Sequence, residues 1–411
     1  MTVAATQETQ PKSLKEMWLI SVGHGLTHWY PATFYLLLPL IAKELGLSYG
    51  QIGFIITFQY IASSISNLPG GMLVDTIGRK GFLMALSLFW VGFPYLLMSF
   101  TDSYLMLLLC VALVGIGNNL WHPTAIPTLS QRYSDRKGFV LSVHGMGGNV
   151  GDALAPLVIG GLLAAFHWKQ VVVMNVVPGL IMSLVIVIFL RNLQLSVKKD
   201  PQTQGVSTRE YILGLGRLFK NKSLILISTS SGFRSMTQNA LLTFLPLYLA
   251  YEMNLDPFWV GVSMFTLQAF GFLAAPLSGH LSDRLGRKKI IMGSMVMTAA
   301  ILVVMAAVGH TRLFIVFIAL LGFFLYAVRP VMQAWLMDTT PKKMAGTSVG
   351  MLFGVQSLGS SISPLLGGMI ADQYGLYATF YFVAATIVIA NLLIFFMPDD
   401  SGPNIHKSAS A

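Results

Sequence analysis

The sequence predicts an all-α membrane protein with twelve transmembrane helices in two pseudo-symmetric six-helix halves, and three observations carry this prediction. Of the 411 residues, 55% are hydrophobic and only 10% are charged, whereas soluble domains have about 25% charged residues. Apolar stretches of about 20 residues, the length that crosses a bilayer, recur along the whole chain. A polar motif also occurs twice, half a chain length apart.

The repeated motif is G-x-x-x-D-x-x-G-R-K, at residues 71–80 and again at 279–288, with apolar stretches before and after each copy. A short polar connection of this kind joins two membrane helices. Its glycines allow a sharp reversal, and its basic residues hold the turn at the lipid headgroups. A chance basic turn would explain one copy, but it does not explain two copies at half-chain spacing.

The chain divides into two halves, 17–190 and 223–396, joined by a cytoplasmic linker at 191–222. Residues 1–16 and 397–411 are expected to be cytoplasmic tails, and the linker near 208–220 to form an amphipathic helix on the membrane surface. The spans are expected near residues 17–40, 50–70, 81–101, 104–128, 138–165, 170–190, 223–250, 258–280, 290–309, 312–337, 346–371 and 375–396.

The two halves also align outside the motif. Pro39 matches Pro246, and Pro156 matches Pro364, at nearly the same offset as the two motif copies. Internal repeats of this kind build secondary transporters, whose substrate site lies near the bilayer midplane between the halves.

The net charge of +10 reflects orientation in a membrane rather than binding of nucleic acid. Most of the 26 Lys and Arg residues fall in the tails, the linker and alternate loops, which the positive-inside rule places in the cytoplasm with both termini. The exceptions are Lys43, Lys169 and Arg312 in the opposite loops, and Arg234 and Arg329 within spans. We expect a multi-pass protein of the cell membrane, here a bacterial inner membrane, and no nucleic-acid partner.

Several function classes are excluded by what the sequence lacks. The single cysteine, Cys110, lies in an apolar stretch and cannot form an intramolecular disulfide or a thiolate metal cluster. The first residues lack the apolar region of a cleaved signal peptide, so the first span is expected to direct insertion. Neither a nucleophile–base pair nor a phosphate-binding loop is visible, so we predict no enzyme, no ATP-driven pump and no cofactor.

Ionisable side chains inside spans are costly and are therefore functional candidates. All of them except Asp152 are cationic or can become so, and a cavity lined in this way favours an anion. We assign substrate binding to Arg234, Arg329, His122 and His28, beside an aromatic wall that includes Trp121 and Tyr30 with Trp29 and Tyr35. The ionisable residues within spans are His24, His28, His122, His144, Asp152, Arg234 and Arg329.

His122–Pro123 and Arg329–Pro330 occupy matching places in the two repeats. A cationic residue before a helix-breaking proline in both halves indicates a pseudo-symmetric pair that faces one cavity. Alternatively, each side chain snorkels toward the headgroups or binds a carbonyl that the proline frees.

His24 and His28 are four residues apart and share a helix face. A metal site is one interpretation, but the sequence offers no thiolate and only one mid-span carboxylate to complete it, so we predict none. Hydrogen bonding between helices, or handling of protons or substrate, remains open. For proton coupling the candidates are Asp152, His24 and His144. Alternatively, Asp152 is a fixed counter-ion of Arg234 or His144.

Charged residues at the cytoplasmic helix ends are expected to form a gate that opens and closes during alternating access. They are expected not to touch substrate. The predicted gate consists of Asp75, Arg79, Asp283, Arg284, Arg287 and Asp338.

The repeated loop motif resembles that of the major facilitator superfamily, and further segments are similar to its fosmidomycin-resistance branch of drug exporters. The similarity covers residues 18–396, and the segments that carry it are 115–123, 136–138, 147–151, 155–157, 352–354 and 367–372. Residues 155–161 and 363–368 also resemble the antiporter signature G-P-x-x-G-G, with Ala155 and Ser363 in place of the first glycine. Two positions depart from the family pattern: Thr76 replaces an Arg, and His28 replaces an acidic residue of the branch.

This resemblance implies proton-coupled antiport that exports a small organic anion or an anionic drug. The expected partners are that anion, protons and the lipid bilayer, and we expect a monomer. Uptake or exchange of an anionic metabolite by the same fold is the first alternative. The second is a non-transporting membrane receptor or scaffold, against which the mid-span charges argue.

Overall fold

The computed structural model describes residues 14–77, 79–118, 120–190, 221–308, 313–340 and 345–397. The expected linker, except for its last residues, and most of both expected tails lie outside these ranges. The regular elements within them are helices: α1 Lys15–Leu45, α2 Tyr49–Thr76, α3 Lys80–Met98, α4 Tyr104–Asn118, α5 Trp121–Arg132, the short 3-10 helix Ser134–Arg136, α6 Lys137–Leu163, α7 Trp168–Leu190, α9 Lys222–Tyr251, α10 Pro257–Leu285, α11 Arg287–Val308, α12 Phe314–Thr339, α13 Ala345–Tyr374 and α14 Tyr377–Phe395.

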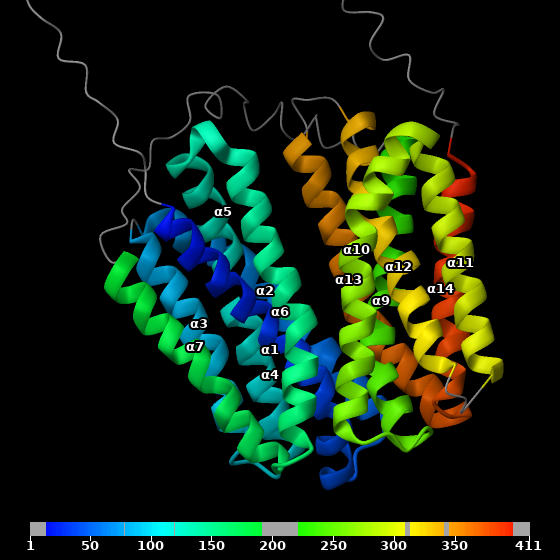
Figure 1. Ribbon diagram of the computed structural model, residues 1–411, viewed down its shortest axis with the longest axis horizontal. Coiled ribbons are helices and arrows are strands. Elements are labelled where there is room, and N and C mark those ends of the chain that lie inside the picture. The colour runs from blue at the N-terminus through cyan, green and yellow to red at the C-terminus, as the bar shows by residue number, and fades with distance from the viewer. Residues whose placement is uncertain are drawn as a thin grey trace, which may run out of the picture.

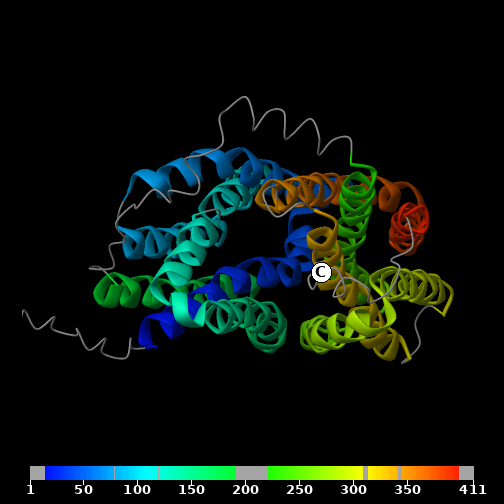
Figure 2. The ribbon, with the colours of Figure 1, turned by 90° about the horizontal axis from the view of Figure 1, so that it is seen from above.

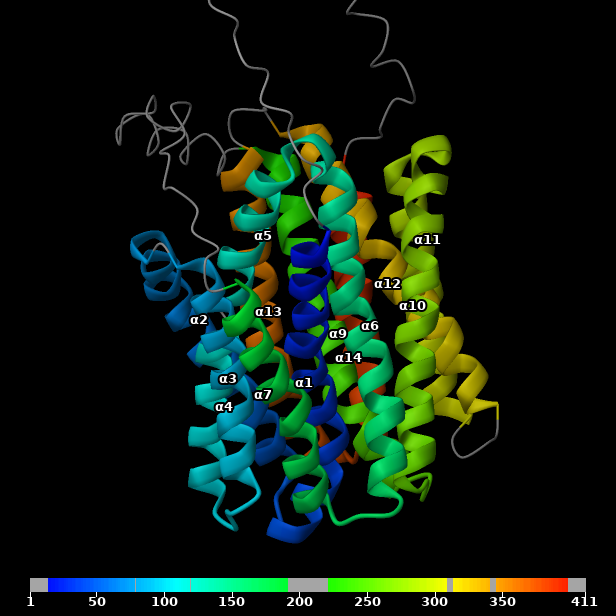
Figure 3. The same cartoon turned by 60° about the vertical axis from the view of Figure 1, so that its left-hand side comes forward.

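The helices form two bundles side by side, α1–α7 and α9–α14 (Figures 1 and 2). The pseudo-symmetry expected from the repeat is visible in how the bundles meet. The second helix of each half packs on the fifth helix of the other: α2 on α13, and α10 on α6 (Figure 3). The first helices of the two halves, α1 and α9, also contact each other.

The span expected near 104–128 is described as two helices, α4 and α5, and residue 119 between them lies outside the described residues. Pro123 is tolerated near the start of α5, since the first turn of a helix has no intrahelical partner for its backbone N–H groups. His122 lies in the first turn of α5, where its side chain is exposed.

Nine helical segments of the described chain are long and apolar enough to cross a membrane by length and composition. The remaining helices α1, α2 and α9 are long enough but more polar. Their polar residues include Thr27, Arg234 and Thr237, which are buried inside the protein rather than exposed to lipid. The most polar spans are therefore those that face the interior.

The helix ends define two faces of the molecule. The terminal face carries the start of α1 and the end of α14, and the opposite face carries the turns at 46–48 and 252–256. At the opposite face Asp372 caps α2 across the boundary between the halves. Its carboxylate accepts hydrogen bonds from the backbone N–H groups of Tyr49 (2.7 Å) and Gly50 (2.8 Å) and from the Ser48 hydroxyl (3.0 Å).

Glycines allow the halves to approach closely near this same face. A Cβ atom at Gly53 would lie 2.1 Å from the carbonyl oxygen of Pro364, and one at Gly261 would lie 2.3 Å from that of Pro156. The Tyr251 hydroxyl also donates a hydrogen bond to the carbonyl of Pro39. Only residues without a side chain permit such contacts between helices.

Three ion pairs among the described residues near the terminal face each lie within one half. Arg132 pairs with Glu16 at 2.6 Å in the first half, and Arg287 pairs with Asp283 (2.6 Å) and Asp338 (3.2 Å) in the second. The two bundles diverge toward this face (Figure 1). The described contacts between the halves thus close the opposite face, and the bundles are farther apart toward the terminal face.

Candidate substrate-binding site

A cavity of about 310 Å³ lies between the two halves. Its wall is built from α1, α2, α4, α5 and α6 of the first half and from α9, α10, α12 and α13 of the second. A midplane site between repeats is the arrangement that the internal repeat predicts.

The cavity brings together five of the predicted site residues from five different helices. The second half contributes Arg234 from α9 and Arg329 from α12, and the first half contributes His28, His122 and Asp152. The matching His–Pro and Arg–Pro pairs of the two repeats therefore face one cavity. The substrate-binding role of these side chains stays a prediction.

Arg234 is almost fully buried, with 2% of its surface exposed. One of its terminal nitrogens donates a hydrogen bond to Gln238, one turn further along α9. Its Nε has no partner among the described residues, and within those residues no carboxylate forms an ion pair with Arg234 or Arg329. A buried guanidinium without a counter-ion is costly, so an anion in the cavity would stabilise this arrangement.

Asp152 is the carboxylate on the cavity wall, and its partner is His28. The Nδ1 atom of His28 lies 2.9 Å from Oδ2 of Asp152, and about a third of each side chain is exposed. From the sequence, Arg234 or His144 was the expected counter-ion of Asp152 if its charge is fixed. The structure joins Asp152 to neither, and this leaves the cationic charge of the two arginines available.

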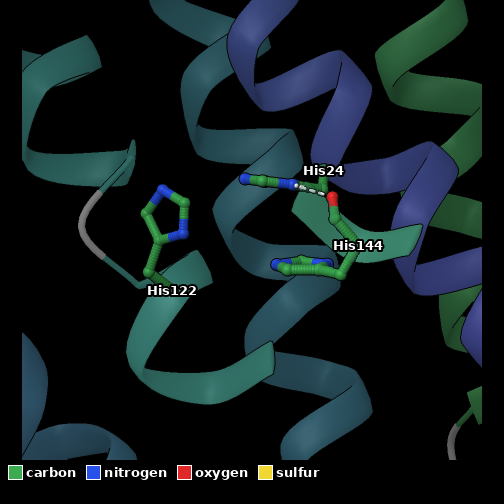
Figure 4. A group of neighbouring side chains, drawn as sticks. All are labelled: His24, His122 and His144. Atoms are coloured by element: carbon green, nitrogen blue, oxygen red, sulfur yellow. Dashed lines mark hydrogen bonds between the residues drawn. The ribbon is translucent and has the colours of Figure 1, made fainter. Parts of the chain in front are cut away.

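His24 and His144 lie behind the cavity wall, in the buried contact between α1 and α6. Their rings stack with centroids 3.9 Å apart and planes 13° apart. The Nδ1 of His24 lies 2.6 Å from the backbone carbonyl of His144 (Figure 4). His122 approaches the same pair from α5, with its ring centroid 4.9 Å from that of His24.

Trp121 and Tyr30, expected in an aromatic wall, are not among the residues that line the cavity. Both are fully buried inside the first half: the Tyr30 hydroxyl donates to the carbonyl of Val176 (3.3 Å), and Trp121 packs against Gly23. Each residue lies on a helix face turned toward its own bundle. Of the expected aromatic group, Tyr35 does line the cavity.

Neutral polar residues also line the wall, and they were not among the residues expected from the sequence, which were mainly ionisable or aromatic. Tyr60 bridges the halves with a hydrogen bond to Asn239, and its hydroxyl also bonds that of Tyr35. Further along the wall are Gln238, Gln268, Gln356 and Ser360. A sequence signal existed: Arg234 and Gln238, like Gln356 and Ser360, are four residues apart and share a helix face.

The predicted gate residues are only partly in contact. Arg287 joins Asp283 and Asp338, whereas Arg79 and Arg284 are exposed at helix ends. The side chain of Asp75 lies outside what the structure describes. The gating role of this group stays a prediction.

Comparisons with known proteins agree with this architecture. The sequence profile of the Major Facilitator Superfamily matches residues 17–274 and 230–411. The hexuronate transporter of Bacillus subtilis (strain 168) is 23% identical over 364 residues, covering 85% of this chain and 86% of that protein. The fosmidomycin resistance protein of Escherichia coli (strain K12) is 26% identical over 404 residues, covering 94% and 93%.

Solved structures show the same fold. A bacterial homologue of the human lysosomal transporter Spinster, in an inward-facing and occupied conformation, superposes with a TM-score of 0.82 at 14% identity, covering 94% of this chain and 97% of that one. With a family profile that spans the chain and relatives that match nearly end to end, the chain belongs to the Major Facilitator Superfamily of membrane transporters.

Proposed function

We propose that this transporter exports a small organic anion in exchange for protons. The observation that carries the proposal is the charge balance of the cavity. Arg234 and Arg329 face it without a carboxylate partner among the described residues, and its carboxylate, Asp152, is already paired with His28. A carboxylate, phosphonate or phosphate would supply the counter-charge, and Arg is the side chain suited to bind it in bidentate fashion.

The pair formed by His28 and Asp152 is the candidate for proton coupling. It lines the same cavity as the two arginines, so the proton site and the proposed anion site lie in one cavity. A proton that arrives from outside changes the charge of the pair, and its release to the cytoplasm restores it. His24 and His144 remain candidates for passing that proton, because His24 adjoins His28 and His144 stacks on His24.

Export is the direction of transport that we propose. With the termini in the cytoplasm, as the distribution of Lys and Arg predicts, the face toward which the two bundles diverge is cytoplasmic, and an exporter takes up its substrate from that side. The similarity to a fosmidomycin resistance protein supports export. The similarity to a hexuronate transporter favours the second candidate, uptake or exchange of an anionic metabolite by the same cavity.

The test is transport by purified protein in liposomes, with a panel of labelled phosphonates and carboxylates and with or without an imposed pH gradient. We expect the gradient to accelerate flux of at least one anion in the wild type and in Arg132→Gln, which removes a cation far from the cavity. Arg329→Gln should lose this flux. Anion flux that ignores the gradient would favour exchange, and no flux of any anion by folded protein would favour a receptor or scaffold.

A further inference from the structure

We propose that His24, His122 and His144 form a binding site for a divalent transition-metal ion at the edge of the cavity. The three rings come from α1, α5 and α6, and one nitrogen of each lies within 4.8 Å of the others. In Figure 4 the free nitrogen of His24 and one nitrogen of His144 point toward His122. Zinc with Zn–N bonds of about 2.0–2.1 Å holds tetrahedral ligand atoms about 3.4 Å apart, so side-chain movements of about an ångström close this set.

The hydrogen bond of His24 fixes which of its nitrogens is free. A backbone carbonyl can only accept, so the His24 Nδ1 that lies 2.6 Å from the carbonyl of His144 must carry the proton. The lone pair is then on Nε2, which is buried and has no partner among the described residues. An outer hydrogen bond that orients an imidazole and exposes its other nitrogen is the arrangement found around metal-binding histidines.

His144 gives the second observation. It is 3% exposed, and neither of its ring nitrogens has a hydrogen-bond partner within the part of the chain that the structure describes. Buried polar atoms are nearly always satisfied, and those that are not require an explanation. A metal ion bound by a His144 nitrogen would satisfy that nitrogen and the Nε2 of His24 together.

The backbone is shaped to bring these rings together. A Cβ atom at Gly148 would lie 2.8 Å from Cε1 of His24, and a Cβ atom at Gly147 would lie 2.2 Å from the carbonyl oxygen of Ser21. These glycines let α6 approach α1 closely enough for the two histidines to stack. Side chains at positions 147 and 148 would push His144 on α6 away from His24 on α1.

An ion can reach this site from the cavity. His122 is exposed and lines the cavity, whereas His24 and His144 are buried behind it. His28 lies beside the group, with its ring centroid 4.7 Å from that of His24, and its Nδ1 is engaged by Asp152. The three imidazoles thus leave a fourth position open on the cavity side, for water, His28 or an oxygen of a bound anion.

The ligand set selects the class of ion. Imidazole nitrogens suit zinc, copper, nickel and cobalt, whereas magnesium and calcium require oxygen ligands. From the sequence no metal site was expected, because only His24 and His28 share a helix face. The partners that complete a site, His122 and His144, come from helices whose placement the sequence does not reveal. The site does not depend on the proposed anion transport.

The test is Co²⁺ binding to the purified full-length protein after removal of any affinity tag, followed by visible absorption and repeated as a competition with Zn²⁺. We expect one ion per chain, with the intense absorption bands of tetrahedral cobalt, displaced by Zn²⁺. His122→Asn and His144→Asn should each weaken Co²⁺ binding by more than about 10-fold. Loss of a residue that only hydrogen-bonds to a metal ligand already weakens metal binding by about 10-fold or more, and these variants lose a ligand itself.

His167→Asn and His280→Asn are the matched controls, because these exposed histidines lie outside the cluster. Both should bind like the wild type. Size-exclusion chromatography and thermal unfolding check that each variant is folded, and His122, being exposed, is the replacement least able to disturb packing. No binding by the wild type, or binding unchanged in folded His122→Asn, would overturn the site. Neither result would affect the anion-transport proposal, which is measured without added metal.

Discussion

Arg234 and Arg329 carry the proposed specificity through the geometry of the guanidinium group as well as through its charge. The planar group of Arg offers two parallel donors to a carboxylate or phosphonate, whereas the ammonium of Lys is a point charge. The hydrogen bond from a terminal nitrogen of Arg234 to Gln238 orients this group, and its Nε has no partner among the described residues and is left to donate to an anion.

Replacing Arg234 by Lys should therefore weaken transport without abolishing it. Loss of one charge-assisted hydrogen bond, worth about 1.5–3 kcal/mol, predicts a decrease in kcat/KM of roughly 10- to 100-fold. Arg234→Gln should be more severe, because the charge is lost as well. The measurement is anion flux into liposomes as a function of anion concentration. Equal kcat/KM values for Arg234→Lys and the wild type would exclude a bidentate contact.

Asp152 should govern coupling more than binding, because it contacts His28 and forms no ion pair with either arginine. In Asp152→Asn the pair of residues 28 and 152 has no carboxylate that can bind and release a proton. We expect the variant to exchange labelled for unlabelled anion at equal concentrations but to lose acceleration by a pH gradient. Gradient-driven flux that survives in Asp152→Asn would move proton coupling to His24 or His144.

The ionisable residues of the cavity could be predicted from the sequence, because a charge inside an apolar span is stable only where it faces the protein interior. The sequence did not reveal that Tyr35 lies on the cavity wall while Trp121 and Tyr30 lie inside the first bundle. An aromatic side chain is equally stable against lipid, inside a bundle or on a cavity wall. The face of α1 that meets the cavity depends on how the neighbouring helices cross it.

At the scale of helices, glycines decide how closely α1 and α6 approach. A Cβ atom at Gly151 would lie 2.0 Å from the backbone carbonyl oxygen of Gly25, so the helices must separate to accept it. Gly161, on the same helix, has nothing within 4 Å of such an atom. These two positions therefore form a matched pair.

Gly151→Ala should lower the free energy of unfolding by about 1–3 kcal/mol, the usual cost of overpacking. Gly161→Ala should be neutral or stabilising by up to about 1 kcal/mol, because Ala favours a helix. Thermal unfolding of both variants in the same detergent measures the difference. Equal midpoints would mean that the contact between α1 and α6 tolerates a methyl group.

The cap that Asp372 places on α2 joins the two halves at the opposite face. Its carboxylate accepts two backbone N–H groups at the start of a helix, where the helix dipole also favours negative charge. Asp372→Asn should shift the population toward the conformation that is open at the opposite face, because about 1–3 kcal/mol of contact energy belongs to the closed state alone.

Spin labels at Phe166→Cys and Phe258→Cys, in a Cys110→Ala background, measure the separation of the halves at this face. Asp372→Asn should raise the fraction of long distances. Asp102→Asn is the control, because Asp102 pairs with Lys169 inside one half. A distance distribution unchanged by Asp372→Asn would show that the cap does not contribute to closure.

For the whole molecule, the low charge content, the recurring apolar stretches and the repeated loop motif together predicted the fold. A motif repeated at half-chain spacing indicates two copies of one bundle, and the packing of α2 on α13 and of α6 on α10 agrees with that symmetry. The open face could not be predicted, because both conformations of a transporter use the same apolar surfaces. It depends on individual contacts such as those of Asp372 and Tyr251.

The most direct measurement for the whole account is calorimetric binding of the same phosphonates and carboxylates to the purified protein, without any gradient. The account predicts that an anion binds to the wild type and to Arg132→Gln with equal affinity. Its affinity for Arg234→Gln and for Arg329→Gln should fall by more than about 10-fold, since each loses a charged hydrogen bond worth about 1.5–3 kcal/mol. Unchanged affinity in both cavity variants, with folding intact, would contradict an anion site between the halves.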